Sequence, residues 1–160
     1  ADTNPKHMQE VFEKAAAHKG TSVIEIMQNC VIFNDKVFSD YTAKENRQES
    51  IITIEHGKPM IFGAEMNKGL VLNGFKLEIV TIGENGVKEE DILVHDAYEP
   101  DSTLHMMLAK LQMPIVNGII RAVAHETYEA RVQQQVEETA KKSKYKSVND
   151  LFTSGETWEI

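Results

Sequence analysis

Apolar residues recur at helical spacing near the start of the chain, at Met8, Val11, Phe12, Ala15 and Ala16. Asn4 and Pro5 precede them as a typical helix start. The Asn side chain can accept a hydrogen bond from a free backbone N–H of the first turn, and proline at the first helical position has no N–H that would be left unpaired. Gly20 is a typical helix stop. The pattern predicts one amphipathic helix over residues 5–19.

The next segment, residues 21–27, is short, mostly apolar and rich in β-branched side chains. This composition predicts a buried strand of a parallel sheet, so that helix, glycine and strand form half of an α/β unit. Residues 28–34 leave this strand at its carboxyl end. The polar stretch from residue 35 to residue 50 is then expected to be a loop or a lid.

From residue 50 onward the pattern becomes typical of β-structure. The apolar run 51–54, a turn at His56 and Gly57, and residues 59–62 indicate a hairpin. A second hairpin is predicted around the Asn73-Gly74 pair, since both positions of the preferred two-residue turn need positive φ. A turn over residues 83–86 and a short strand over 92–94 complete a predicted antiparallel β module at residues 50–96.

The last third of the chain returns to helical spacing. Asp101 and Ser102 are expected to cap a helix that ends at Pro114, and one face of it is apolar, with Leu104, Met107, Leu108 and Leu111. Residues 115–123 predict a second apolar strand, and residues 127–142 a polar helix. A short helical turn is expected at residues 148–152, so this part is an αβα segment.

Composition narrows the class of protein. Of the 160 residues, 41% are hydrophobic and 26% charged, which is typical of a globular domain. A net charge of −8 argues against nucleic-acid binding, and the chain lacks the long apolar run of a membrane span. The single cysteine excludes a disulfide within the chain, and we expect a cytoplasmic protein. The chain does not begin with Met, and we expect further residues to precede it.

Cys30 is the main chemical candidate, because it follows the predicted strand at the edge of the sheet where α/β proteins bind ligands. The competing interpretation is a small buried hydrophobic residue. Two of the six histidines have suggestive neighbours: His95 precedes Asp96, while His125 and Glu126 lack the second histidine of a zinc helix. Solvated or capping roles are expected for the histidines, and the lysines between 141 and 146 are expected to lie at a solvated helix end.

Several longer segments, taken together, resemble one enzyme family. They are residues 18–35, 56–63, 93–96, 118–129 and 154–160. They resemble the C-terminal half of the β subunit of 2-oxoacid:ferredoxin oxidoreductases, particularly the 2-oxoglutarate type, including its C-terminus. The resemblance implies an α/β fold: the C-terminal part of a thiamine-diphosphate-binding domain (1–35), a loop with an inserted antiparallel β module (36–100), and a C-terminal αβα segment with a tail (101–160).

The resemblance also implies an activity, namely oxidative decarboxylation of 2-oxoglutarate to succinyl-CoA with electron transfer to ferredoxin. The intact enzyme would use thiamine diphosphate, Mg²⁺ and a [4Fe-4S] cluster, and would contain an α subunit. The family's Gly-Asp-Gly motif for the diphosphate is missing from this sequence. Of the cluster cysteines only the last is present, as Cys30. We therefore expect this chain alone to bind no cofactor and to be inactive.

Two alternative functions remain open at this point. The β module at residues 50–96 could serve as a binding module that contacts the α subunit and shields the cofactor. The second alternative is a small thiol-dependent enzyme in which a histidine acts as the base for Cys30. No histidine lies at a spacing from which the sequence can link it to Cys30. In the family interpretation, the strand at 21–27 lacks neighbours, and its unpaired backbone is expected to favour self-association.

Overall fold

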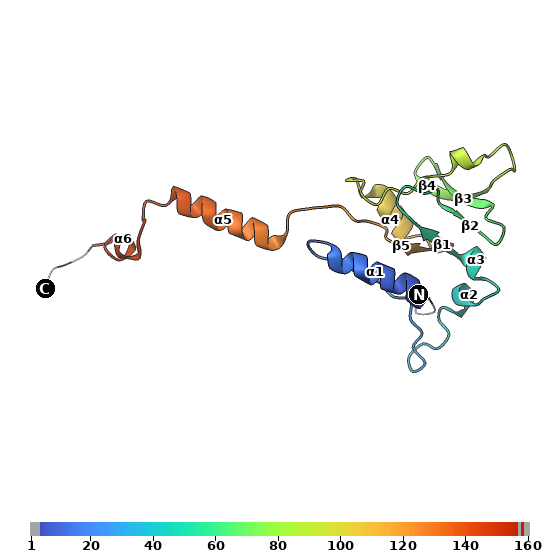
Figure 1. Cartoon of the computed structure of the whole chain (residues 1–160), viewed down its shortest axis with the longest axis horizontal. Coiled ribbons are helices and arrows are strands. Elements are labelled where there is room, and N and C mark those ends of the chain that lie inside the picture. The colour runs from blue at the N-terminus through green and yellow to red at the C-terminus, as the bar shows by residue number, and fades with distance from the viewer. Residues whose placement is uncertain (1–3, 157, 159–160) are drawn as a thin grey trace. The chain divides into compact units, whose positions relative to one another are not determined.

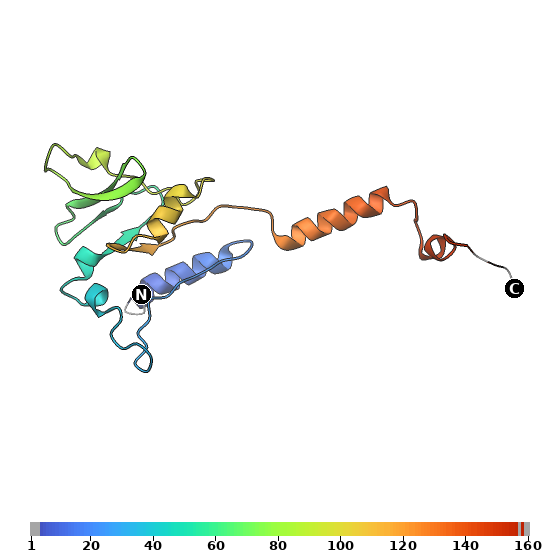
Figure 2. The same cartoon turned by 180° about the vertical axis from the view of Figure 1, so that it is seen from behind.

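The structure is a computed structural model that describes residues 4–156 and residue 158. It divides the chain after Ala124 into two compact units, each of which is described by itself below. Figures 1 and 2 show the elements of both units from opposite sides. The predicted division into residues 1–35, 36–100 and 101–160 follows the family and stays a prediction. Part of its C-terminal tail, at 157 and 159–160, lies outside the described residues.

The first predicted helix is confirmed. Helix α1 spans Pro5–Ala17, and the side chain of Asn4 accepts a hydrogen bond from the backbone N–H of His7 at 3.3 Å. The helix ends two residues before the predicted limit, and the N–H of His18 still closes onto the Lys14 carbonyl at 3.2 Å. Gly20 follows with a φ of 124°, which glycine adopts without a steric penalty.

The predicted strand at residues 21–27 is wrong for this structure. The segment has no regular secondary structure, and Val23 is 91% exposed. A strand is held by hydrogen bonds to neighbouring strands, and none of the described strands pairs with these residues. The β-branched composition thus gives a local preference for extended backbone, which is not sufficient without a partner.

Two short helices, α2 (Ser39–Thr42) and α3 (Arg47–Ser50), lead into strand β1 (Ile51–Ile54). Strand β1 does not form the predicted hairpin with residues 59–62. It pairs in parallel with β5 (Ile115–Gly118), so that Ile51 lies opposite Ile115 and Ile54 opposite Gly118. The hairpin prediction failed because local turn signals do not show which distant strand completes a sheet.

A second sheet is antiparallel, in the order β2 (Ile61–Phe62), β3 (Lys68–Asn73) and β4 (Lys76–Thr81). The predicted β3–β4 hairpin is confirmed, but its turn is shifted by one residue and consists of Gly74 and Phe75. Only Gly74, at φ 59°, adopts the positive φ that was expected at both turn positions. The predicted strand at 92–94 appears as a single bridge between Pro59 and Val94, next to a short 3₁₀ helix, η1 (Glu89–Asp91).

Helix α4 (Thr103–Ala109) packs with both sheets around one small core. The predicted apolar face is confirmed, since Leu108 is buried and Leu104 and Leu111 pack against the core cluster. The buried members of that cluster are Ile52, Ile54, Met60, Phe62, Leu70 and Leu108. Parallel and antiparallel pairing therefore occur in one mixed α/β unit. Residues 101–124 belong to it because β5 pairs with β1.

The second unit contains helices α5 (Tyr128–Lys142) and α6 (Val148–Phe152), as predicted. The Thr127 hydroxyl caps α5 by accepting the N–H of Ala130 at 3.2 Å, and Ser147 and Asp150 form a capping box on α6. Neither helix buries a residue in the described structure. Among the described residues, no helix has the length and apolar content needed to cross a bilayer.

Candidate functional site

Cys30 stands at the start of a tight turn in the first unit. Its carbonyl accepts a hydrogen bond from the N–H of Asn34 at 2.9 Å, which closes the turn as an isolated antiparallel bridge. The three residues between them are large, apolar and exposed; they are Val31, Ile32 and Phe33. Cys30 is itself exposed, so the interpretation as a small buried hydrophobic residue is wrong for this structure.

The turn also directs backbone N–H groups at the thiol. The N–H groups of Phe33 and Ile32, with a smaller effect from Asn34, lower the pKa of Cys30 from its usual 9.0, and this outweighs slight desolvation. The groups that lower this pKa are all backbone amides and none is a histidine. The thiolate is the form that binds metal and acts as a nucleophile, so the loop stabilises the reactive form of Cys30.

A second set of hydrogen bonds holds the ends of this turn together. The amide of Asn29 donates to the carboxylate of Asp35 at 2.9 Å, and its carbonyl oxygen accepts from the N–H of Lys36 at 2.7 Å. Lys36 adopts a φ of 61°, a left-handed conformation that is uncommon for a residue with a side chain. The short loop around Cys30 is therefore fixed from both sides.

The donor set of this chain fits one ligand of an iron–sulfur cluster and no more. A cluster of this kind needs four protein ligands, normally thiolates, and Cys30 is the single cysteine. No group of three or more His, Cys, Asp or Glu side chains that could hold a metal ion occurs in the described part of the chain. The remaining ligands of any such cluster would come from outside these 160 residues.

Two histidines form a separate buried cluster, contrary to the expectation of solvated or capping roles. His95 is fully buried and His105 is 3% exposed, and their ring centroids lie 6.1 Å apart. His95 follows the segment that bridges to Pro59, and His105 lies on α4. The apolar residues Leu93 and Val94 before His95 indicate a partly buried segment. They do not show which of its side chains are buried.

Hydrogen bonds fix the chemical state of His105. Its Nε2 lies 2.7 Å from the carbonyl oxygen of Asp96, and its Nδ1 lies 2.8 Å from a guanidinium nitrogen of Arg121. Because arginine can only donate, Nδ1 must accept, and the ring is neutral with its proton on Nε2. Arg121 also donates to the carbonyls of Glu99 and Pro100. This network ties the loop before α4 to the segment after β5 and is structural.

His56 is the accessible member of the neighbourhood. Its Nδ1 lies 3.2 Å from a carboxylate oxygen of Asp96, and its ring stacks edge-on against Tyr98 with centroids 4.6 Å apart. His56, Asp96 and Tyr98 are all at least half exposed. No group of three side chains that could hold a metal ion forms around His56 among the described residues.

The burial of His95 predicts a loss of stability in acid. Burial lowers the pKa of His95, and it outweighs the hydrogen bond to the Ile119 carbonyl and the charge of Asp96, which raise it. The unfolded chain therefore takes up a proton near pH 6.5, while the folded chain does so only at lower pH. The free energy of unfolding should fall by up to about 1.4 kcal/mol per pH unit as pH drops below that point.

Urea unfolding between pH 7.5 and pH 5 measures this effect. His95→Gln should weaken the pH dependence in this window, whereas the matched substitution of the exposed His125, His125→Gln, should leave it unchanged. The Nδ1 atom of His95, buried without a partner in the described structure, marks where the proton would have to enter. An equal pH dependence in all three proteins would contradict the assignment to His95.

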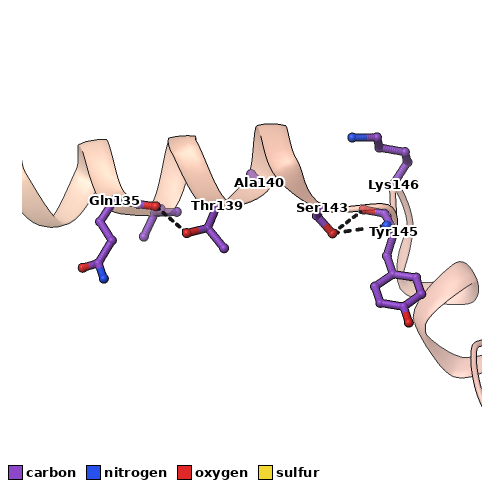
Figure 3. A pocket seen from close by; sticks show the side chains of 7 residues that line it. Gln135, Thr139, Ala140, Ser143, Tyr145 and Lys146 are labelled. Atoms are coloured by element: carbon purple, nitrogen blue, oxygen red, sulfur yellow. Dashed lines mark hydrogen bonds between the residues drawn. The ribbon is translucent and has the colours of Figure 1, made fainter.

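The second unit contains a surface hollow with a volume of about 610 Å³ (Figure 3). Figure 3 shows it beside the C-terminal end of α5, where the Ser143 hydroxyl donates to the Tyr145 carbonyl at 3.1 Å and accepts its N–H at 3.2 Å. The side chain of Lys144, with a smaller effect from Ser154, lowers the pKa of Tyr145. The hollow is open and contains no nucleophile with a base, so its shape alone assigns it no chemistry.

Comparison with known proteins gives one informative match. No protein-family model matches the chain, and no solved structure matches it significantly. The chain is similar to the 2-oxoglutarate oxidoreductase subunit KorB of Mycobacterium tuberculosis, with 33% identity over 165 aligned positions. The alignment covers 99% of this chain and 43% of KorB, so the chain spans less than half the length of this curated relative. The resemblance stated from the sequence is thereby confirmed.

Proposed function

We propose that this chain is the C-terminal part of the β subunit of a 2-oxoglutarate:ferredoxin oxidoreductase. The observation that supports it best is the 33% identity to KorB, a 2-oxoglutarate oxidoreductase subunit, over 99% of the chain. The reaction is the oxidative decarboxylation of 2-oxoglutarate to succinyl-CoA, with the electrons passed to ferredoxin. The partners are an α subunit and ferredoxin, and the location is the cytoplasm.

In this proposal Cys30 supplies one thiolate to a [4Fe-4S] cluster whose other ligands precede this chain. The lowered pKa of Cys30 supports the role, because a cluster binds the deprotonated sulfur. The same N–H groups of Ile32 and Phe33 would point at the bound sulfur, and hydrogen bonds to the sulfurs tune the potential of a cluster. The exposed Val31, Ile32 and Phe33 would exclude water from it.

Thiamine diphosphate and Mg²⁺ are assigned to the missing half of the subunit. The diphosphate motif Gly-Asp-Gly does not occur in these 160 residues, and their described part holds no group of metal-binding side chains. When bound, thiamine diphosphate supplies the electron sink for the carbanion left by decarboxylation. The role of this chain is to complete the fold, to add the last cluster ligand and to take part in subunit contacts. It is inactive by itself.

The test is an assay of the complete subunit, produced together with its α subunit under anaerobic conditions. We expect 2-oxoglutarate and coenzyme A together to drive the reduction of ferredoxin, with pyruvate as the control substrate. The 160-residue chain alone, incubated with thiamine diphosphate, Mg²⁺, iron and sulfide, should give no turnover. Activity of this chain alone, or no 2-oxoacid oxidation by the assembled complex, would refute the proposal.

A further inference from the structure

Strand β4 is the free edge of the antiparallel sheet. The sheet has the order β2, β3, β4, so β4 has a neighbour on one side only among the described strands (Figure 1). It is six residues long, and its charged residues Lys76 and Glu78 are exposed. Such an edge presents unpaired N–H and C=O groups to which another strand can pair.

The register of the hairpin shows which backbone groups are free. A turn of two residues joins Asn73 to Lys76, so this closing pair exchanges the hydrogen bonds between β3 and β4. Hydrogen-bonded pairs alternate along an antiparallel ladder, and Glu78 therefore also points its backbone groups at β3. The backbone groups of Leu77 and Ile79 point away from it. These N–H groups have no other backbone partner in the described structure.

Only certain pairings with a second β4 use these outward groups. A two-fold antiparallel pair in phase with them places a residue of β4 on the symmetry axis, and an axis at Ile79 sets Glu78 opposite Val80 and forms no pair of charges. An axis at Lys76 sets two lysines opposite each other, and an axis at Glu78 sets two glutamates opposite each other; both are unfavourable. An axis at Leu77 places Lys76 of each copy opposite Glu78 of the other. Within β4, the axis at Leu77 is therefore the one that pairs opposite charges, and charge complementarity favours this register.

The same register also pairs the exposed apolar side chains of the hairpin. With Leu77 on the axis, Phe75 of one copy lies opposite Ile79 of the other, and these side chains are 99% and 46% exposed in the single chain. The Asn73 amide donates to the Glu78 carboxylate at 3.0 Å, which holds that charge on the face of the hairpin. Lys76 makes no ion pair within the described structure, so it is free to meet Glu78 of a second copy.

We propose that two copies of this chain associate through β4, paired antiparallel about Leu77, to form a continuous six-stranded sheet. The interface is symmetric, so each opposite-charge pair and each Phe75–Ile79 pair occurs twice. It is independent of the enzymatic function proposed above. The sequence predicted self-association through residues 21–27, which form no strand. The proposal assigns self-association to β4 instead.

Sedimentation equilibrium of the 160-residue chain at low salt tests this pairing from micromolar to millimolar concentration. We expect a monomer–dimer equilibrium that weakens with added salt, because the charged pairs are exposed. Lys76→Glu or Glu78→Lys alone turns both attractive pairs into repulsive ones, and dimerisation should weaken about tenfold. The double variant K76E/E78K restores opposite charges and should return the dissociation constant to about the original value.

Two further variants separate pairing from folding. Ile79→Pro removes an outward N–H, which an edge strand tolerates, and should abolish the dimer while circular dichroism stays unchanged. Lys6→Glu, an equal charge reversal at an exposed position of α1, is the matched control and should leave dimerisation unaffected. A chain that stays monomeric at millimolar concentration, or a double variant as weak as the singles, would overturn the proposal.

Discussion

Replacing Cys30 with alanine in the complete subunit is expected to abolish ferredoxin reduction and to lower the iron content of the purified complex. The expectation rests on the proposed role of this thiolate as a cluster ligand. Changes in the groups that merely support a metal ligand already cost about 10–100-fold in affinity or activity, and loss of the ligand itself should cost at least about 100-fold. Iron analysis, the visible absorption of the cluster and anaerobic turnover measure the effect.

The experiment needs a control for the loop itself. Asp40→Asn is the control: Asp40 is exposed on α2 and is not among the groups that shift the pKa of Cys30, so iron content and turnover should match the wild type. Cys30→Ser keeps a weaker oxygen ligand and should fall between alanine and wild type in iron content. Full iron content together with undiminished turnover in the alanine variant would show that Cys30 does not bind the cluster.

Gly118→Ala should destabilise the first unit by about 3 kcal/mol, among the larger effects of a single substitution. Gly118 ends β5 with a φ of 123°, a conformation that side chains rarely permit. An added Cβ would lie 2.5 Å from the carbonyl oxygen of Ile54, its partner on β1. The Ile54 carbonyl oxygen belongs to the backbone, so the clash can be removed only if β1 and β5 move apart. That movement would expose the buried Ile52 and Ile54.

Urea unfolding followed by far-ultraviolet circular dichroism measures this loss of stability. The matched control is Gly155→Ala, where an added Cβ meets nothing within 4 Å, so its unfolding midpoint should stay within error of the wild type. An unchanged midpoint for Gly118→Ala would mean that the parallel pairing of β1 with β5 does not contribute to the stability of the chain.

Local signals in the sequence were sufficient wherever a structure is stabilised by near neighbours. The predicted cap at Asn4 places the first helix correctly, because a capping hydrogen bond spans only three residues. The helices predicted at residues 127–142 and 148–152 also form. The β3–β4 hairpin also forms as predicted, although its turn shifted by one residue. The strand predicted before Cys30 does not form, so the family resemblance remains as the signal for this residue. The hydrogen bonds that lower its pKa come from the following turn and appear only in three dimensions.

The sequence by itself determined helices α1, α4, α5 and α6, the central hairpin, the family resemblance and Cys30 as the residue to test. Only the tertiary structure decided that residues 51–54 pair with residues 115–118, that residues 21–27 stay unpaired, and that His95 and His105 are buried. The reason is physical. Helix caps and tight turns depend on atoms a few residues apart, whereas sheet pairing and burial depend on which distant segments meet.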